Sequence, residues 1–224
     1  MGTAAALTSC SKEETQEVLD TMIAPKITLV FDKAKVEAKE ATFTIREFTN
    51  NDSQKEAFVD LNGNLKKDEG EEFEADKEYT VTAERVSIVG EIIQRLEFES
   101  NNLHKAEVTH RYIKNLSFDD ASLESVVIIN AQSLETLDVS SGDSKNNLTE
   151  LVLPDDKQKI ANLKELTIAN CPKLPRTEVF KSLPNRTGKD PIGRVSLSIV
   201  DDELSEKEKE ILKDLHWEIF FYDN

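Results

Sequence analysis

Five oxygen-bearing side chains between residues 60 and 71 have the spacing of a calcium-binding loop. They occupy positions 1, 3, 5, 9 and 12 of a twelve-residue loop, and they are Asp60, Asn62, Asn64, Asp68 and Glu71. Calcium requires several oxygen ligands, and this spacing lets one turn deliver them to a single point. Position 6, which normally holds glycine, is Leu65, a residue poorly suited to a positive φ. The same residues also fit the tip of a β-hairpin turned by Asn62-Gly63, so both interpretations remain open.

A second group of acidic residues could supply the paired carboxylates of a glycoside hydrolase. This group consists of Glu97, Glu99, Asp119 and Asp138. Their places in a ten-residue repeat put them on one strand surface, spread over successive segments. The pattern therefore predicts a solvated face that attracts basic partners, and it argues against two carboxylates converging in a cleft.

The cysteines and histidines form no recognisable catalytic or metal motif. Cys171 follows a repeat at a turn position, which favours a buried structural thiol over a nucleophile. The histidines, His104, His110 and His216, show no H-x-x-x-H spacing, and the chain has no C-x-x-C pair. We therefore expect no enzyme activity and no cofactor beyond the possible calcium.

The elements that would position these residues come from an apolar triplet, L-x-x-L-x-L, that returns about every ten residues. The regular copies are Ile93-Leu96-Phe98, Leu103-Ala106-Val108, Ile113-Leu116-Phe118, Leu123-Val126-Ile128 and Leu134-Leu137-Val139. Looser copies start at Leu148, Leu163 and Ile192. The alternating last pair indicates a short strand, and such a segment must stack on its neighbours to bury its apolar side. The repeat predicts a mixed, β-rich, leucine-rich-repeat-like solenoid of short parallel strands. Eight core residues are expected: Leu96, Phe98, Leu116, Phe118, Leu137, Val139, Leu166 and Ile168.

The flanking segments predict four parts. Residues 1–24 are expected to be a signal remnant followed by a polar tether, and residues 25–85 are expected to form a small β domain that caps the solenoid. Residues 86–171 contain the repeats, and residues 172–224 are expected to form an α/β cap. In the last part, Ser205 and Glu208 fit the capping box of a helix, and Trp217, Ile219 and Phe221 alternate as a final strand.

One repeat breaks the alternation with a run of four apolar residues at 126–129. Val127 and Ile129 should point outward there, and Val152 takes the matching position in a later repeat. An exposed apolar strip of this kind often marks a binding surface. The alternative is that the protein itself covers the strip with the longer segment Gly142–Asn147 or with a neighbouring loop.

The charge balance excludes several partners. The formal net charge is −16, from 44 acidic and 28 basic residues. This charge argues against nucleic acid, which requires a basic footprint, and against docking on anionic lipid. Two cysteines cannot form a disulfide framework, and no apolar run is long enough to span a bilayer.

The N-terminal string Leu7-Thr8-Ser9-Cys10 resembles a bacterial lipobox, in which the cysteine becomes the lipid anchor. The stretch before it is too short for a complete signal peptide, and Cys10 could also be an accidental residue of the terminus. The acidic string Ser11-Lys12-Glu13-Glu14 resembles the signal that follows the cysteine in surface lipoproteins of Bacteroidetes.

Together, the repeats, residues 58–64 and the segment 183–188 followed by Trp217 resemble internalin-like leucine-rich-repeat lipoproteins of Bacteroidetes. This resemblance implies a recognition protein on the cell surface, without catalytic residues. The chain departs from the family pattern at the ninth repeat position, where Ala121, Ala131, Gly142 and Asp156 replace asparagine or cysteine.

We therefore expect a monomeric, non-catalytic binding protein, lipid-anchored at the bacterial outer membrane, that recognises a protein or glycan. Membrane contact would be made only through the anchor. The alternative is a structural envelope or stalk component without a specific ligand, and a hydrolase is a third, less favoured interpretation.

Overall fold

A computed structural model of the chain describes residues 25–50, 57–91, 93–100, 102–118, 123–140, 147–198 and 203–222. The N-terminal elements are β1 (Lys26–Phe31), α2 (Lys33–Glu37), β2 (Thr42–Asn50), β3 (Phe58–Asp60), β4 (Glu78–Thr80) and β5 (Arg85–Val89). The middle elements are β6 (Ile93–Glu99), β7 (Leu103–Thr109), β8 (Asn115–Ser117), β9 (Ser125–Asn130), β10 (Thr136–Asp138), β11 (Glu150–Val152), the short 3-10 helix η2 (Lys157–Ile160) and β12 (Glu165–Thr167). The C-terminal elements are α3 (Arg176–Lys181), β13 (Gly193–Ser198), α4 (Glu206–Asp214) and β14 (Trp217–Tyr222).

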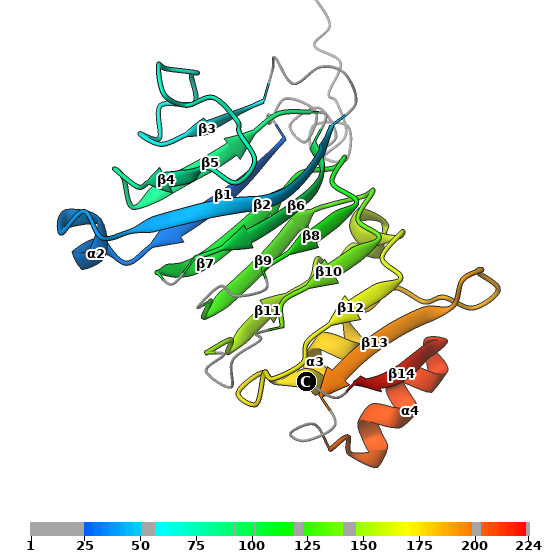
Figure 1. Cartoon of the computed structure of the whole chain (residues 1–224). Helices are drawn as coiled ribbons and strands as arrows, with labels where there is room; N and C mark the ends of the chain where they lie inside the picture. Colours follow the sequence, from blue (N-terminus) through cyan, green and yellow to red (C-terminus); the bar gives the residue numbers. More distant parts are fainter. Residues whose placement is uncertain are drawn as a thin grey trace, which may run out of the picture.

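The strands form two mixed sheets (Figure 1). The six-stranded sheet has the order β11-β9-β7-β1-β5-β3, and the eight-stranded sheet has the order β14-β13-β12-β10-β8-β6-β2-β4. Strands from β6 onward pair in parallel with one another, whereas every pairing that involves β1, β2, β3, β4 or β5 is antiparallel, including β1 with β7 and β2 with β6. The N-terminal strands are therefore hydrogen-bonded members of both sheets.

The predicted leucine-rich-repeat solenoid, with an N-terminal β cap and a C-terminal α/β cap, is wrong. Within the described residues, β1 lies between β7 and β5 and pairs antiparallel with both, and β2 pairs antiparallel with β6. The chain thus builds two mixed sheets and not a stack of separate coils closed by caps. A short apolar strand carries no sequence mark of its partner, so the repeat could not reveal that these strands continue the same sheets. The four-part division of the chain stays a prediction.

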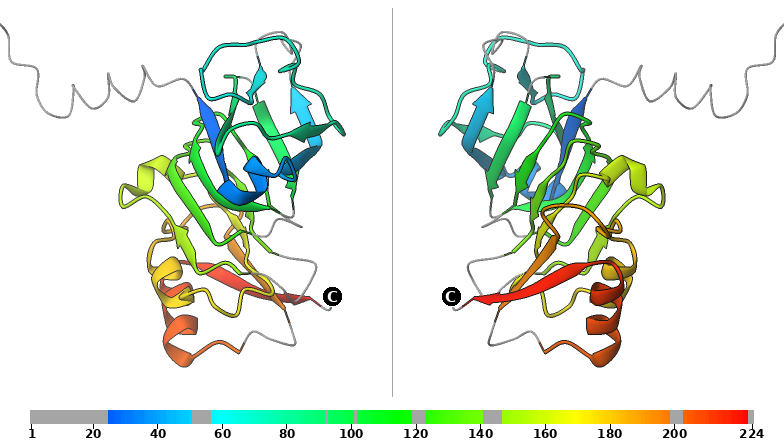
Figure 2. Two further views of the ribbon diagram at one scale, coloured as in Figure 1. Left: turned by 90° about the vertical axis from the view of Figure 1, so that its left-hand side faces the viewer. Right: turned by 90° about the vertical axis from the view of Figure 1, so that its right-hand side faces the viewer.

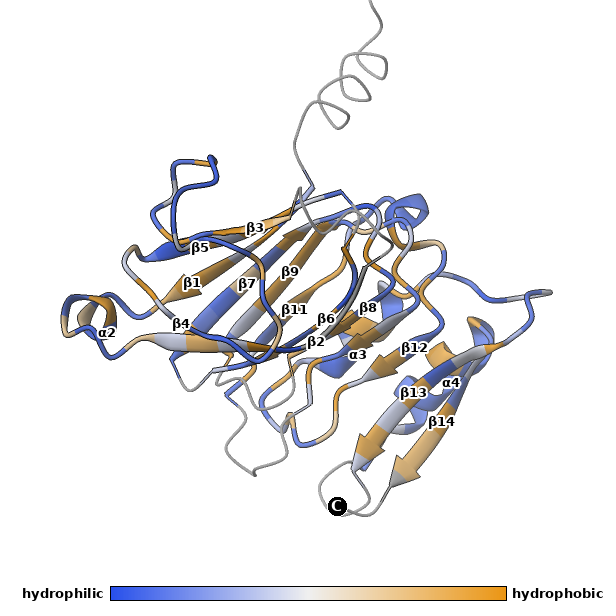
Figure 3. Cartoon of the chain, turned by 45° about the horizontal axis from the view of Figure 1, so that its top comes forward, coloured by the Kyte–Doolittle hydropathy of each residue, from blue (hydrophilic) through white to orange (hydrophobic). Residues whose placement is uncertain are grey.

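The burial predicted from the repeat is confirmed. All eight expected core residues are at most 3% exposed. Equivalent leucines stand in register, since Leu96 is the partner of Leu116, and Leu116 is the partner of Leu137. One apolar cluster joins the inward side chains of both sheets, and Figure 3 shows hydrophobic residues along their strands.

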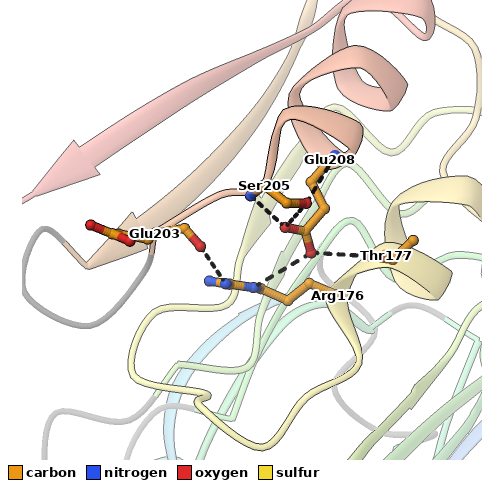
Figure 4. A network of polar contacts seen from close by, with 5 residues as sticks. All are labelled: Arg176, Thr177, Glu203, Ser205 and Glu208. Atoms are coloured by element: carbon orange, nitrogen blue, oxygen red, sulfur yellow. Dashed lines mark hydrogen bonds and ion pairs between the residues drawn. The ribbon is translucent and has the colours of Figure 1, made fainter.

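The C-terminal elements are held by a polar network and a close contact. Ser205 and Glu208 form the predicted capping box at the start of α4. The buried Glu208 carboxylate also accepts a hydrogen bond from Thr177 Oγ1 at 3.2 Å and lies 4.0 Å from Arg176 Nε, while Arg176 Nη2 donates to Glu203 O (Figure 4). Burial alone would raise the pKa of Glu208, but the Ser205 hydrogen bonds and the Arg176 charge lower it. The network thereby ties α3 to α4 at the C-terminal end of the molecule (Figure 2).

Candidate binding surfaces

The outer face of the eight-stranded sheet carries rows of polar side chains. Residues on either side of each buried leucine point outward, and the parallel register aligns them across neighbouring strands. One row runs through Arg95, Asn115, Thr136, Glu165 and Arg194, and the other through Glu97, Ser117, Asp138, Thr167 and Ser196. Adjacent members of a row stand about 4.8 Å apart along the sheet. We call these ten residues the polar face.

A shallow groove of about 270 Å³ opens on the polar face over β6, β8 and β10. Its lining consists of Arg95, Leu96, Glu97, Asn115, Leu116, Ser117, Thr136 and Asp138. The groove therefore offers cationic, anionic, amide and hydroxyl groups to one ligand, all of them on strands that the core holds rigidly.

Burial perturbs the carboxyl group of Asp138 in this groove. Burial raises its pKa above the ordinary value, and hydrogen bonds donated by the Ser140 hydroxyl and backbone N–H, at 2.6 and 2.9 Å, lower it in part. Because its pKa is raised, this carboxyl keeps its proton to a higher pH than an exposed aspartate.

The four acidic residues expected on one surface have different positions. Glu97 and Asp138 lie in the same row and line the same groove. Glu99 lies farther along β6 and forms an ion pair with Arg46 of β2. Asp119 lies outside the described residues. Sequence reasoning missed Asn115 and Thr136, although both directly precede the second apolar residue of a triplet, as Arg95 does.

The apolar strip lies on the outer face of the six-stranded sheet. Val127 of β9 and Val152 of β11 are partners in the parallel register. Ile129 is 46% and Val152 is 40% exposed, whereas Val127 is half-buried. Most of the segment Gly142–Asn147, which could cover the strip, lies outside the described residues.

The loop from Asp60 to Glu71 is closed by an antiparallel bridge between Phe58 and Glu72. Asp60 is fully buried, and its carboxylate accepts hydrogen bonds from the backbone N–H groups of Asn64 at 3.0 Å and Leu65 at 3.1 Å. Leu65 has a φ of +57°, so the chain adopts at position 6 the left-handed conformation that glycine favours. The loop thus takes the turn that a leucine was expected to resist.

The other acidic members of this loop complete its hydrogen bonding. Glu71 is 3% exposed and accepts from the backbone N–H groups of Leu61 at 2.8 Å and Asp68 at 2.9 Å. The side-chain amides of Asn62 and Asn64 both donate to Asp68 Oδ2 at 2.7 Å and lower the pKa of Asp68. Over the described ranges, no group of three or more His, Cys, Asp or Glu residues is placed to hold a metal ion. A cation here would therefore depend on the asparagine oxygens as well as on the carboxylates.

Cys171 and His110 are buried in the core, whereas His104 lines a pocket together with Val152 of the apolar strip. Cys171 is buried, as predicted, and its thiol lies 3.4 Å from Ala169 O. His110 is fully buried, its Nε2 lies 2.7 Å from Gly90 O, and burial lowers its pKa. His104 Nδ1 lies 3.4 Å from Glu124 Oε2 at an exposed site.

Comparison with protein-family models, curated proteins and solved structures finds no match to this chain. No helix among the described residues is long and apolar enough to cross a membrane.

Proposed function

We propose that this chain is a non-catalytic binding protein that recognises a protein or glycan through the polar face. The observation that supports this proposal is the groove of about 270 Å³, in which charged, amide and hydroxyl side chains stand in register on three parallel strands. Side chains fixed on strands lose little freedom when a ligand binds, which favours affinity. The mixture of donors and acceptors suits a ligand rich in hydroxyl or amide groups.

The arrangement of the acidic groups favours binding over hydrolysis. Glu97 and Asp138 stand two strands apart on an open face, with Ser117 between them. The two carboxyl groups of a glycoside hydrolase must flank the scissile bond, whereas Glu97 and Asp138 project side by side from one face of the sheet. The competing proposal is a structural envelope component without a ligand. It differs in one measurable way, because it predicts that no ligand binds specifically in the groove.

The test is binding of the purified chain to arrayed glycans and to immobilised surface and matrix proteins. Asn115→Ala and Asp138→Ala should each weaken binding about tenfold or more, as loss of a hydrogen bond to a charged or buried group does. Lys207→Ala, on the exposed face of α4, is the matched control and should bind as the wild type does. If groove variants that keep the wild-type Tm bind normally, the groove is not the site. If the wild type binds nothing, the structural alternative is favoured.

Cys10 is the proposed lipid anchor, which would hold the protein at the bacterial outer membrane. The string Leu7-Thr8-Ser9-Cys10 supports this proposal, and it lies outside the described residues. In the native cell, Cys10→Ala in the complete precursor should move the protein from the membrane fraction to the soluble fraction. Unchanged fractionation would contradict the anchor.

Calcium is the proposed ligand of the loop from Asp60 to Glu71. All five candidate side chains, Asp60, Asn62, Asn64, Asp68 and Glu71, offer the oxygen donors that calcium prefers. The positive φ of Leu65 also supports the proposal, because a calcium loop bends sharply at this position. A bound cation would offset the repulsion between the loop carboxylates and stiffen the loop.

Titration calorimetry with calcium chloride tests this proposal. The wild type should release or absorb heat at up to millimolar calcium, and Asp68→Ala should weaken the binding. Leu65→Gly should strengthen it, because glycine adopts a positive φ without the cost of a Cβ. Absence of any calcium-dependent heat in both the wild type and Leu65→Gly would leave only the hairpin.

A further inference from the structure

The last strand of the eight-stranded sheet has an open edge. In the described part of the chain, β14 has one hydrogen-bonded neighbour, β13, with which it pairs in parallel. The Gly193 N–H donates to His216 O at 3.1 Å, and Gly193 is the register partner of Trp217. By the alternation of a parallel ladder, the backbone groups of Trp217, Ile219 and Phe221 therefore point away from β13.

This edge lacks most of the features that normally prevent strand pairing, and Glu218 is its one charged residue. The other edge strands, β3, β4 and β11, are three residues long, whereas β14 has six residues and a regular register with β13. The edge strand contains neither lysine nor proline. Phe220 is 39% and Phe221 is 49% exposed, and the arrowhead end of β14 is coloured hydrophobic in Figure 3. A long apolar edge of this kind is suited to pairing with another strand.

We propose that two copies of this chain pair through antiparallel β14 strands, with the two Ile219 residues facing each other on a two-fold axis. In this register, Ile219 pairs with Ile219 of the second copy, and Trp217 pairs with Phe221. The backbone groups of Trp217, Ile219 and Phe221, which point toward the open edge, then all form hydrogen bonds with β14 of the second copy. If the register shifts by two residues in either direction, one of these three residues lies opposite a position beyond the end of β14 and loses its hydrogen-bonding partner. The backbone therefore favours a single symmetric register.

The side chains at this register are complementary in charge. On the outer face, Glu218 lies opposite Phe220 of the second copy. The guanidinium of Arg194 stacks on Phe220 within each copy, 4.2 Å from the ring centroid. Arg194 is the register partner of Glu218 in its own copy, and its guanidinium reaches over Phe220 toward the position of Glu218 of the second copy, a pair that the two-fold axis repeats. On the inner face, Phe221 lies opposite Trp217 of the second copy, whose ring stays buried in its own copy against Gly193.

This self-complementarity favours a second copy over an unrelated strand, whereas the expectation from the sequence is a monomer. Because the two-fold axis runs perpendicular to the sheet, both polar faces point to the same side of the dimer. Two copies of the ligand site on one side allow bivalent binding, a consequence that rests on the proposed function. The dimer itself does not depend on that function.

Sedimentation of the full chain tests the dimer, with Cys10→Ser as the background to prevent disulfide exchange. Mass should rise from 25.2 kDa toward twice that value with increasing concentration. The double variant Phe220→Lys/Phe221→Lys should stay monomeric and folded, with a Tm lowered only by the loss of the Arg194 stacking on Phe220 and of the partial burial of both rings. The matched control, Val152→Lys on the β11 edge, should dimerise as the background does. A monomer at every soluble concentration, or a dimer in the double-lysine variant, would overturn the proposal.

A charge exchange tests the register. Glu218→Arg and Arg194→Glu, each alone, should weaken self-association about tenfold or more, as loss of a close interfacial charge pair does. An equimolar mixture of the two variants should regain association, because both charge pairs are opposite in sign in the mixed dimer. A mixture that associates no better than its components would rule out this register.

Discussion

The parallel strands from β6 to β12 and the antiparallel strands from β1 to β5 build the same two sheets with different cores. In the parallel region, like side chains stack in register: Leu96, Leu116 and Leu137 form an aliphatic ladder, and the ring centroids of Phe98 and Phe118 lie 5.3 Å apart. In the antiparallel region, Phe43 packs between Phe31 and Tyr79, with ring centroids 5.7 and 5.2 Å away. The comparison shows that a repeated core can be recognised from spacing alone, whereas a core without repetition depends on particular pairings.

The largest expected effect comes from one truncation in each region. Phe43→Ala should lower the free energy of unfolding by about 3–5 kcal/mol and Leu116→Ala by about 2–5 kcal/mol, because each side chain is 1% exposed. Since one apolar cluster joins the regions, both variants should shift the same single transition in urea, followed by circular dichroism and by Trp217 fluorescence. Two separate transitions, each affected by one variant, would support the boundary expected near residue 85.

A smaller effect is expected where the parallel region ends. A Cβ added to Gly193 would lie 2.3 Å from the Trp217 ring, so Gly193→Ala should destabilise the protein by about 1–3 kcal/mol. The Trp217 emission spectrum should shift, since the ring must move. A wild-type Tm and spectrum would mean that β13 and β14 adjust more freely than the rest of the parallel region.

The junction of the two regions should be sensitive to pH. His110 follows β7, and its ring contacts Gly90 O at the end of β5. Burial lowers its pKa below the ordinary value of 6.5, so the unfolded chain takes up a proton before the folded one does. Its contribution to stability is therefore complete above pH 6.5 and is lost as the pH falls toward the folded-state pKa, with a slope of at most about 1.4 kcal/mol per pH unit. Urea unfolding from pH 7.5 to 5 should show this slope in the wild type and lose it in His110→Gln.

The smallest effect concerns one hydrogen bond inside the antiparallel region. Thr28 Oγ1 and Ser87 Oγ lie 3.1 Å apart and are buried between β1 and β5. Thr28→Val or Ser87→Ala alone should cost about 1 kcal/mol, because each leaves a buried hydroxyl without this partner. The double variant should cost less than the sum of the two, as measured by a double-mutant cycle in urea. Additive losses would show that the pair contributes no coupling to this region.

Local patterns predicted several elements well. The triplet spacing identified the buried positions of the parallel strands, because alternation places them on the inward side. Ser205 and Glu208 predicted the start of α4, because a capping box satisfies backbone N–H groups within one turn. Pairing was not predictable in the same way. Nothing local to β1 specifies that it inserts between β7 and β5, since hydrogen bonds to a sheet neighbour use backbone groups that every residue carries.

The candidate surfaces follow the same division. The sequence by itself determined which side chains alternate outward, such as Glu97 and Asp138, and it determined the oxygen-rich spacing from Asp60 to Glu71. Only the tertiary structure decided that Glu97 and Asp138 share a groove with Asn115, that Leu65 takes a positive φ, and that β14 ends the sheet with its edge open. The physical reason is the distance along the chain over which each interaction acts. Alternation and turn spacing act over a few residues, whereas a groove, a strained turn and a sheet edge exist only after distant strands have paired and the core has fixed their register.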